Sequence, residues 1–411
     1  MHASGFPQPL AGKVILDLST LFPGPYCTSL LAAFGARVIK IEPPGKGDPM
    51  RAFTPRMFEE LNRNKASVAI NLKHDEGKAV LKKMAARADA LVEGFRPGVM
   101  HRLGVGYESL RKTNPALVYC ALSGFGQHGP YRDKAGHDLG FLALGGYYSV
   151  PSQIDGVKSR PHVRLADIVA GLFAAQATSM AIWEAQASGE GRLVDVSLFD
   201  SVAAIVLPMM FSSPGLATGD VRQMAHVMAD SDLFETRDGR YLALTTFEDK
   251  LWKGFAAAVA AHSPELAGER FATRKGRDAH KIELSALLKR LFKTRTLAQW
   301  RDILDSADSV WCPVYERDEL LSDPHFKARG FLAGVHGERS GEALCYSLFP
   351  AEFNAARETI RCPAPSLGAH TEPTLRELGF SEADIEDLRR KGIVQQASGG
   401  PEPARERPEP C

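Results

Sequence analysis

The chain has 411 residues, 44% of them hydrophobic and 24% charged, so it can bury a large core and would ordinarily divide into two domains. Its 50 Lys and Arg residues balance 49 Asp and Glu residues, so no overall charge draws it to nucleic acid or to an anionic membrane. The six cysteines are widely spaced and form no CxxC pair, which argues against a zinc site and a disulfide framework and favours a reducing compartment.

The two ends of the sequence carry no targeting pattern. We find neither a signal peptide nor an uninterrupted apolar run of about 18 residues, so we expect a cytoplasmic protein without a membrane partner. Residues 396–411 are rich in Pro, Glu and Arg and have almost nothing apolar to bury, which predicts a disordered tail.

Short apolar runs alternate with helical patterns over the first two hundred residues. Helices are expected at 27–35, where Gly35 closes the pattern, and at 75–88, which has an acidic start and a basic end. Strands are expected at 14–20, 36–44, 67–72, 89–95 and 116–126. This alternation predicts an α/β domain with a Rossmann-like, doubly wound parallel sheet, whose ligands bind beyond the carboxyl ends of the strands.

The second half predicts a smaller α+β domain. A long apolar helix from Ile168 and a further strand and helix precede a break at 212–220, and a hairpin then turns at Asp238 and Gly239 before helices that run to about Asp308. We therefore expect a large domain at 1–215, a small domain at 229–310, and a C-terminal segment at 325–393 that returns to the large domain.

Basic residues and glycines gather in the expected strand-end loops. Lys40 is followed by GKGDPMR, NRNK occupies 62–65, and FRPGVMHRLG occupies 95–104. Such loops suit phosphate groups, because Lys and Arg donors and free backbone amides can converge on one anion. Neither GxGxxG nor GxxxxGK[ST] occurs, so the fold class alone does not support a dinucleotide or ATP site.

Several long segments resemble the family that joins α-methylacyl-CoA racemases to the family III CoA-transferases. They are 14–48, 95–131, AGHDLGFLALGG at 135–146, GEGRLVDVSLFDS at 189–201, and 367–394. The resemblance implies a CoA-binding large domain completed by the C-terminal segment, a small second domain and an interlocked homodimer. It also implies an acyl-CoA substrate, with no cofactor beyond the CoA moiety and no metal.

The resemblance also implies which residues contact CoA. Arg96 and Arg102 match the family's phosphate-contacting arginines, and Lys40 sits where a basic residue flanks the adenosine phosphate. The full expected set is Lys40, Asn64, Lys65, Arg96, Arg102, Gly136 and Asp138.

Two reactions are compatible with the carboxylate that matches the family's reacting aspartate, Asp167 in PHVRLADIVAG. Inversion of the carbon next to a thioester needs one group to remove the α-proton and a second group to return one on the opposite face. A CoA-transferase instead needs a carboxylate that attacks the thioester and carries the acyl group as an anhydride. We also expect backbone amides at the start of the Asp167 helix to hold the thioester carbonyl.

His137 favours the racemase. Racemases carry a GHD segment about thirty residues before the aspartate, and transferases usually have a non-basic residue at the histidine position. Glu248 matches the racemase glutamate that orients this histidine. The sequence therefore predicts 1,1-proton transfer on a 2-methyl-branched acyl-CoA by His137, Asp167 and Glu248, although each could instead be a helix cap or a first-turn residue.

The alternatives stay open. Residues 168–171 follow Asp167 in a pattern closer to that of transferases, and Asp249 stands where racemases favour proline, whereas LFPGPYC at 21–27 is racemase-like. A family III CoA-transferase working through Asp167 is thus the main alternative. A catalytically silent CoA-binding protein and a β-elimination or hydration enzyme are lesser ones.

Overall fold

The structure is a computed structural model and describes residues 5–213, 215–307, 310–336 and 343–397. It divides into a first unit of residues 1–145, 161–202 and 329–411 and a second unit of residues 146–160 and 203–328. The second unit thus includes 146–160, and its longer part begins at residue 203, inside α9 (Leu198–Ser212). The sequence suggested that the large domain ends at 215. Most of the expected tail, 398–411, lies outside the described residues.

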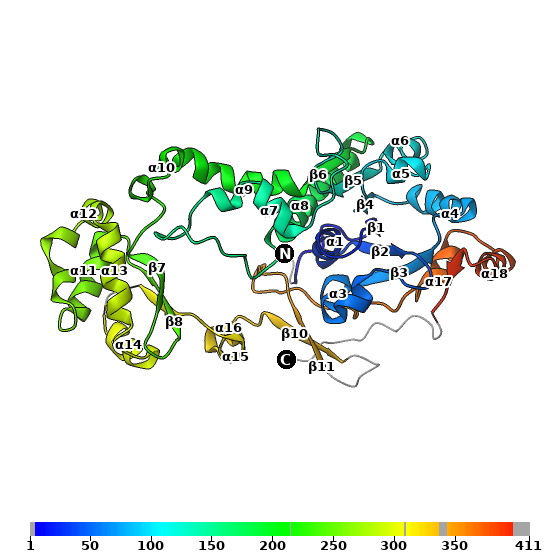
Figure 1. The fold of residues 1–411 in the computed structure, drawn as a ribbon. Coiled ribbons are helices and arrows are strands. Elements are labelled where there is room, and N and C mark those ends of the chain that lie inside the picture. The colour runs from blue at the N-terminus through cyan, green and yellow to red at the C-terminus, as the bar shows by residue number, and fades with distance from the viewer. Residues whose placement is uncertain (1–4, 214, 308–309, 337–342, 398–411) are drawn as a thin grey trace. The chain divides into compact units, whose positions relative to one another are not determined.

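A seven-stranded sheet forms the centre of the first unit (Figure 1). Its order is β12-β3-β2-β1-β4-β5-β6, and all neighbours are parallel except β12, which pairs antiparallel with β3. The strands are β1 (Val14–Leu18), β2 (Arg37–Glu42), β3 (Lys65–Ile70), β4 (Ala90–Glu93), β5 (Val118–Ser123), β6 (Leu193–Ser197) and β12 (Val394–Gln395). The predicted doubly wound parallel sheet is confirmed.

The first helix of the first unit begins at a proline. α1 begins at Pro23, four residues before the predicted start, because proline at the first helical position has no N–H to leave unpaired. The other helices are α2 (Met50–Phe53), α3 (Pro55–Asn62), α4 (Asp75–Ala85), α5 (Val99–Arg102), α6 (Tyr107–Leu110), α7 (Asp138–Leu144), α8 (Leu165–Ser188), α17 (Thr371–Glu377) and α18 (Glu382–Arg390); α1 ends at Ala33.

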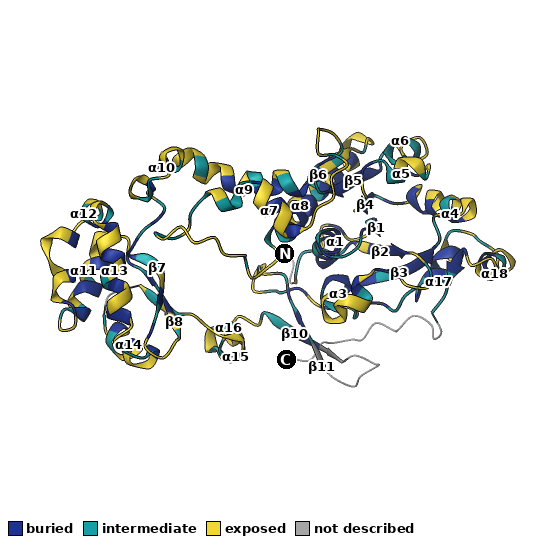
Figure 2. Cartoon of the chain, viewed as in Figure 1, coloured by how far each residue is buried: buried dark blue, intermediate teal, exposed yellow. Residues whose placement is uncertain are grey.

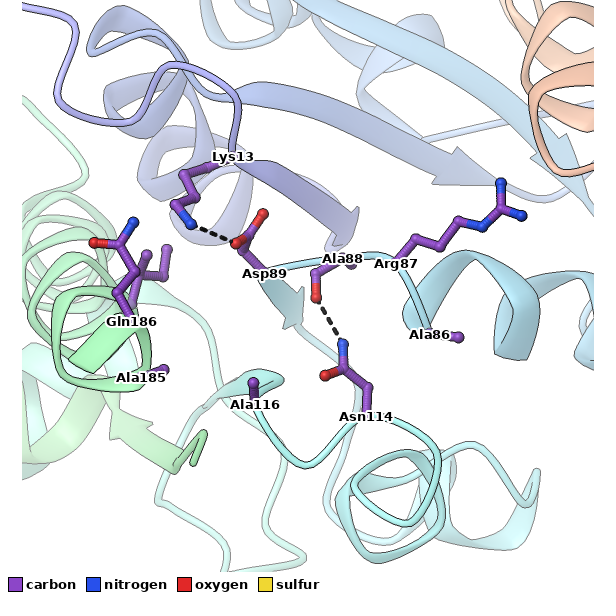
Figure 3. Close-up of a pocket in the computed structure, with 10 residues that line it drawn as sticks. Lys13, Ala86, Arg87, Ala88, Asp89, Asn114, Ala116, Ala185 and Gln186 are labelled. Atoms are coloured by element: carbon purple, nitrogen blue, oxygen red, sulfur yellow. Dashed lines mark hydrogen bonds and ion pairs between the residues drawn. The ribbon is translucent and has the colours of Figure 1, made fainter. Parts of the chain in front are cut away.

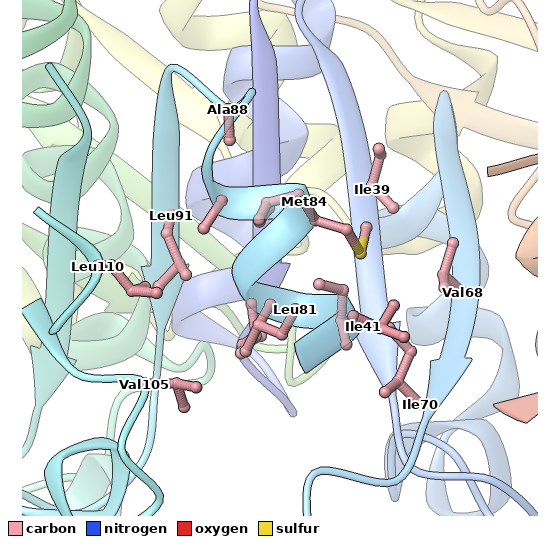
Figure 4. Packing of buried hydrophobic residues seen from close by; sticks show 14 of the residues in the cluster. Ile39, Ile41, Val68, Ile70, Leu81, Met84, Ala88, Leu91, Val105 and Leu110 are labelled. Atoms are coloured by element: carbon pink, nitrogen blue, oxygen red, sulfur yellow. The ribbon is translucent and has the colours of Figure 1, made fainter. Parts of the chain in front are cut away.

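One face of the sheet packs against α4. Leu81 and Met84 lie over Ile39 and Val68 of the neighbouring strands, and all four are at least 96% buried (Figure 4). Figure 2 shows the same division across the unit, with buried strands and exposed outer helix faces. Burial of this apolar surface is the main favourable contribution to the fold of the first unit.

α8 is long and apolar enough to cross a membrane by length and composition, the only such helix in the described part of the chain. In the first unit it packs against α1, β5 and β6. A Cβ atom on Gly171 would lie 2.8 Å from the Pro23 carbonyl oxygen, so only glycine allows α1 to approach this closely. The glycine that follows Asp167 at 171 therefore has a packing role.

The second unit holds the predicted hairpin. β7 (Ser231–Glu235) and β8 (Tyr241–Thr245) pair antiparallel, and Gly239 takes a φ of 76° at the turn, as the Asp-Gly signal predicts. β9 (Trp311–Pro313) completes the sheet, and Trp252, Phe255 and Trp300 lie in the core. The helices are α10 (Gly215–Thr218), α11 (Asp249–Val259), α12 (Arg274–Ala279), α13 (Lys281–Phe292), α14 (Leu297–Leu304), α15 (Arg317–Ser322) and α16 (Pro324–Ala328).

The C-terminal part of the first unit attaches to the edge of the large sheet. It begins with a hairpin of β10 (Leu332–His336) and β11 (Ala343–Ser347), which the sequence did not predict. The amide of Ala69 in β3 donates to the Thr371 hydroxyl at 3.0 Å, and the amide of His370 donates to the Ser67 carbonyl at 2.9 Å. These contacts and β12 add the end of the chain to the sheet.

The described cysteines include free thiols and one disulfide-bonded residue. Cys27, Cys120 and Cys312 are free, whereas Cys345 is disulfide-bonded. Burial raises the pKa of Cys120 to about 12, which keeps this thiol protonated and unreactive.

Candidate active site

The neighbouring strands β1 and β4, in the middle of the sheet, mark the edge where a ligand is expected to bind. β1 leads through α1 to β2 on one side, whereas β4 leads to β5 on the other, so the loops after β1 and β4 diverge. In open parallel sheets ligands bind at such a point, outside the carboxyl ends of the strands. The two loops touch, since a Cβ atom on Gly94 would lie 3.4 Å from the Ser19 Cβ atom.

Arginine side chains gather at the turn after β4. Arg96 and Arg102 are both exposed there. Gly98 has a φ of 82°, and a Cβ atom on it would lie 3.0 Å from Arg102 Nη1 and 3.1 Å from Arg132 Nη2. Two guanidinium groups thus converge on one glycine turn, where a phosphate could accept from both. The sequence missed Arg132, because only the fold brings its loop to this turn.

The ammonium groups of Lys40 and Lys65 are enclosed. Lys40 Nζ lies 2.9 Å from Asp48 Oδ2 and donates to the Ser19 carbonyl at 2.9 Å, and Lys65 Nζ lies 3.0 Å from Asp17 Oδ2. Burial lowers the pKa of Lys65 to about 8, although the charge of Asp17 opposes this shift. Lys40 and Lys65 were expected to contact CoA. In the structure their side chains have no exposed surface, and each forms an ion pair with a buried aspartate instead.

Asn64 holds the C-terminal segment. It has a φ of 62°, and its Oδ1 atom accepts from the amides of Arg361 at 2.7 Å and Cys362 at 3.2 Å. It precedes β3 and so lies at the amino end of that strand, not at the ligand edge. The expected nucleotide contact is corrected accordingly. The loop at the carboxyl end of β3 is 71–74, which contains Lys73 and His74. The sequence analysis named no candidate site residue in this loop.

Asp138 joins the starts of two helices. Its Oδ1 atom accepts from the amide of Ala166 at 2.8 Å and from that of Asp167 at 3.3 Å. Asp138 begins α7, and Asp167 lies in the first turn of α8. The contact therefore places the segment with His137 next to the helix with Asp167. It also assigns Asp138, which is 91% buried, to the protein framework instead of to CoA.

The carboxyl group of Asp167 is largely enclosed, since the residue is 7% exposed. Burial raises its pKa to about 7, the negative charge of Asp138 adds to this shift, and Arg164, 3.9 Å away, opposes it. Near pH 7 this carboxyl group is thus present in both protonated and ionised forms, which suits a group that gives and takes protons.

The backbone amides at the start of α8 are already hydrogen-bonded. Besides the two bound by Asp138, the amide of Leu165 donates to the Val163 carbonyl and that of Ile168 to the Arg164 carbonyl, both at 2.9 Å. The expectation that these amides hold the thioester carbonyl is therefore wrong.

His137 and Gly136 precede α7. His137 is exposed, and its carbonyl accepts from the amide of Gly140 at 2.8 Å, so its backbone starts the helix while its side chain faces solvent. A Cβ atom on Gly136 would lie 2.6 Å from Phe141 Cε1. Gly136 therefore allows close packing against the Phe141 ring. This packing accounts for a glycine at position 136 without any contact with CoA.

Glu248 belongs to the second unit, where it is exposed and precedes α11. Its carbonyl accepts from the Trp252 amide at 2.9 Å. The next residue, Asp249, lies 2.9 Å from Nη2 of the buried Arg277, which gives a structural reason for the departure from proline. Orientation of His137 by Glu248 stays a prediction, because the two residues belong to different units.

A polar cavity of about 300 Å³ lies at the amino ends of the strands (Figure 3). Lys13 and Asp89 form an ion pair at 2.8 Å, and Asn114 Nδ2 donates to the Ala88 carbonyl at 2.8 Å. These polar groups pair with one another, and they lie at the opposite edge of the sheet from the Gly98 turn. Among the described residues, no cluster of three or more His, Cys, Asp or Glu side chains could hold a metal ion.

These features define a doubly wound α/β protein with an enclosed, titratable carboxyl group and an arginine-lined turn at the ligand edge. Residues 10–371 match the family described as CoA-transferase family III, and the chain belongs to that family. The family prediction from the sequence is confirmed.

The relatives include both kinds of enzyme. The chain is 34% identical over 401 residues to succinyl-CoA–D-citramalate CoA-transferase of Chloroflexus aurantiacus, covering 94% of this chain and 98% of the relative. It is 30% identical over 393 residues to human alpha-methylacyl-CoA racemase, covering 94% and 97%. Among solved structures, a CAIB/BAIF family protein from Brucella suis superposes with a TM-score of 0.77 at 27% identity, covering 91% of this chain and 100% of that one.

Proposed function

We propose that the protein inverts the α-carbon of a 2-methyl-branched acyl-CoA by 1,1-proton transfer. The observation that carries the proposal is the pair of helix starts joined by Asp138, which sets an enclosed carboxyl group with a pKa near 7 beside the segment of an exposed imidazole. A reversible inversion needs two such groups, because each must remove a proton in one direction and return it in the other.

The residues divide the work as follows. The arginines at the Gly98 turn bind CoA phosphates, and Asp167 and His137 work opposite faces of the α-carbon. Breaking the C–H bond moves the proton to one group and leaves an enolate, which takes a proton from the other group. Each acid or base contributes about 10²- to 10⁴-fold in rate. The α8 amides are occupied, so other groups must stabilise the enolate oxygen.

The test is α-proton exchange in deuterated water over a panel of acyl-CoAs, with and without a free acid acceptor. We expect exchange without the acceptor and a loss of at least about 10²-fold in His137→Ala, with CoA binding retained. Wild-type exchange in His137→Ala would contradict the racemase.

CoA transfer is the second candidate, favoured by the identity of 34% to a relative named as a CoA-transferase. Here the Asp167 carboxylate attacks the thioester carbonyl, the C–S bond breaks, and CoA leaves as a thiolate while the acyl group stays on Asp167 as an anhydride. Hydroxylamine or borohydride should then trap an adduct on Asp167 when a donor thioester is supplied. Absence of an adduct, together with acceptor-independent exchange, would exclude this candidate.

We also propose an interlocked homodimer in the cytoplasm that needs no cofactor beyond the CoA moiety of its substrate. The family resemblance and the exposed position of Glu248, available to a second copy of the chain, support this assembly. Light scattering after size exclusion should give twice the chain mass of 44.7 kDa, and a monomer would contradict it.

A further inference from the structure

A cavity of about 480 Å³ opens in the first unit beside the start of α8. α1, α3 and the segment at 347–358 supply most of its walls. Much of the lining is apolar and includes Phe22, Tyr26, Leu30, Leu61, Ile168 and Phe349. This volume and lining are typical of small-molecule sites. Arg164 also lines the cavity, and its Nη1 atom lies 3.9 Å from Asp167 Oδ2, so the cavity lies near the candidate reacting carboxyl group.

Four charged side chains line this cavity, and Arg63 and Glu358 are more enclosed than the other two, Glu60 and Arg164. The side chains of Arg63 and Glu358 are 10% and 2% exposed, and Arg63 Nη2 lies 3.6 Å from Glu358 Oε2. Glu358 Oε2 also accepts from the Phe349 amide at 2.7 Å. Arg63 Nε and Glu358 Oε1, however, are buried without a hydrogen-bond partner in the described structure. Buried donors and acceptors are rarely left unpaired, so this N–H group and this oxygen point to a ligand.

We infer that this cavity binds the acyl chain and that Arg63 and Glu358 recognise a hydroxyl group on it. The inference rests on the proposed function and names its substrate class. A hydroxyl group can accept from Arg63 Nε–H and donate to Glu358 Oε1 at once. The charges of Arg63 and Glu358 cancel, and so do those of Glu60 and Arg164, the other charged side chains of the lining, so the cavity has no excess positive charge to offer a ligand carboxylate.

The experiment compares three 2-methylacyl-CoAs of equal length that end in a methyl, a hydroxymethyl or a carboxylate group. Turnover is followed as α-proton exchange, or as CoA transfer if that is the reaction found. We expect kcat/KM for the hydroxylated chain to exceed that of the methyl chain by about tenfold or more, since a site built around a hydroxyl discriminates against analogues that lack it. Equal values, or a preference for the carboxylate, would overturn the inference.

Variants test whether Arg63 and Glu358 cause the preference for the hydroxylated chain. The double variant Arg63→Met with Glu358→Leu replaces both partners by apolar groups of similar size, so it avoids leaving one buried charge alone. It should treat the methyl and hydroxylated chains within about threefold of each other. Arg37→Gln, which changes an exposed arginine outside the cavity, should keep the wild-type ratio. An unchanged ratio in the double variant would contradict the assignment.

A variant whose larger side chain fills the cavity distinguishes failure of this inference from failure of the proposed function. Leu30→Trp should abolish turnover of the long chains and keep that of propionyl-CoA, and loss of both or of neither would count against the cavity. If no thioester reacts even with wild-type protein, the proposed function fails, and calorimetric binding of the free hydroxylated acid decides the cavity. Binding that is lost in Leu30→Trp supports it, and no binding overturns it.

Discussion

The carboxylate of Asp138 accepts hydrogen bonds from the backbone amides of Ala166 at 2.8 Å and Asp167 at 3.3 Å, and its negative charge helps to raise the pKa of the Asp167 side chain. One residue therefore both positions the candidate reacting carboxyl group and sets the pH range in which it ionises.

Replacement of Asp138 should separate these two effects. Asp138→Asn keeps an oxygen that accepts from both amides but removes the charge, so the pKa of Asp167 should fall and the acidic limb of the pH–rate profile should move to lower pH. Asp138→Ala also removes the acceptor and should lower kcat by about tenfold or more. A pH profile unchanged in Asp138→Asn would show that the charge does not reach Asp167.

The raised pKa of Asp167 predicts a pH-dependent stability. Because the fold favours the protonated form, this group stabilises the protein below about pH 4, and the contribution is lost as pH rises through about 7. The interval between 3.8 and about 7 corresponds to at most about 4 kcal/mol. Urea denaturation of wild type and Asp167→Asn at several pH values should show this loss in the wild type alone, and parallel curves would contradict it.

The Gly98 turn predicts the effect of losing Arg132. Arg132→Ala should weaken CoA binding by about tenfold, the order expected for one hydrogen bond to a charged group. Thioesters of pantetheine without the nucleotide phosphates should react at unchanged kcat/KM. Equal losses for both kinds of thioester would mean that Arg132 supports the fold of the loop instead.

The enclosed lysines predict a stability effect. Lys65→Met would leave Asp17 buried without its ammonium partner at 3.0 Å, which should cost about 3–5 kcal/mol of unfolding free energy. The exposed Lys46→Met is the matched control and should change it by less than about 0.5 kcal/mol. Calorimetry of the folded fraction should give wild-type CoA affinity for Lys65→Met, and a large loss of affinity would restore the nucleotide role.

The packing of α4 on the sheet predicts that substitutions at two neighbouring residues of this helix change the unfolding free energy by different amounts. Leu81 is fully buried, so Leu81→Ala should lower the unfolding free energy by about 2–5 kcal/mol. Its exposed neighbour offers the control Lys82→Ala, with a change below about 0.5 kcal/mol. Similar denaturation midpoints for the two variants would mean that this face of the sheet tolerates a cavity.

Sequence reasoning predicted the strands β1 to β6 and the β7–β8 hairpin turn, because apolar periodicity and the Asp-Gly turn are local signals, but it missed the β10–β11 hairpin. The family prediction rested on the resemblance of long segments. It misjudged Lys40, since a basic residue near a strand end looks the same whether it faces solvent or a buried Asp48. Asp138 was interpreted as a CoA contact for a similar reason, because its partners lie 28 and 29 residues further along the chain. Arg132 needed the fold to bring it to the Gly98 turn.

The pairing of β12 with β3 has a consequence for how the chain matures. Residues 394–395 supply an outer strand to a sheet whose other strands end by residue 197, so ribosomal synthesis must pass the whole second unit before that edge is covered. Until then β3 presents unpaired backbone groups, the kind of edge on which nascent chains associate wrongly. Most of the second unit, residues 203–328, is inserted between β6 and β12, so this unit can complete its own core before the last strand of the first unit has been made.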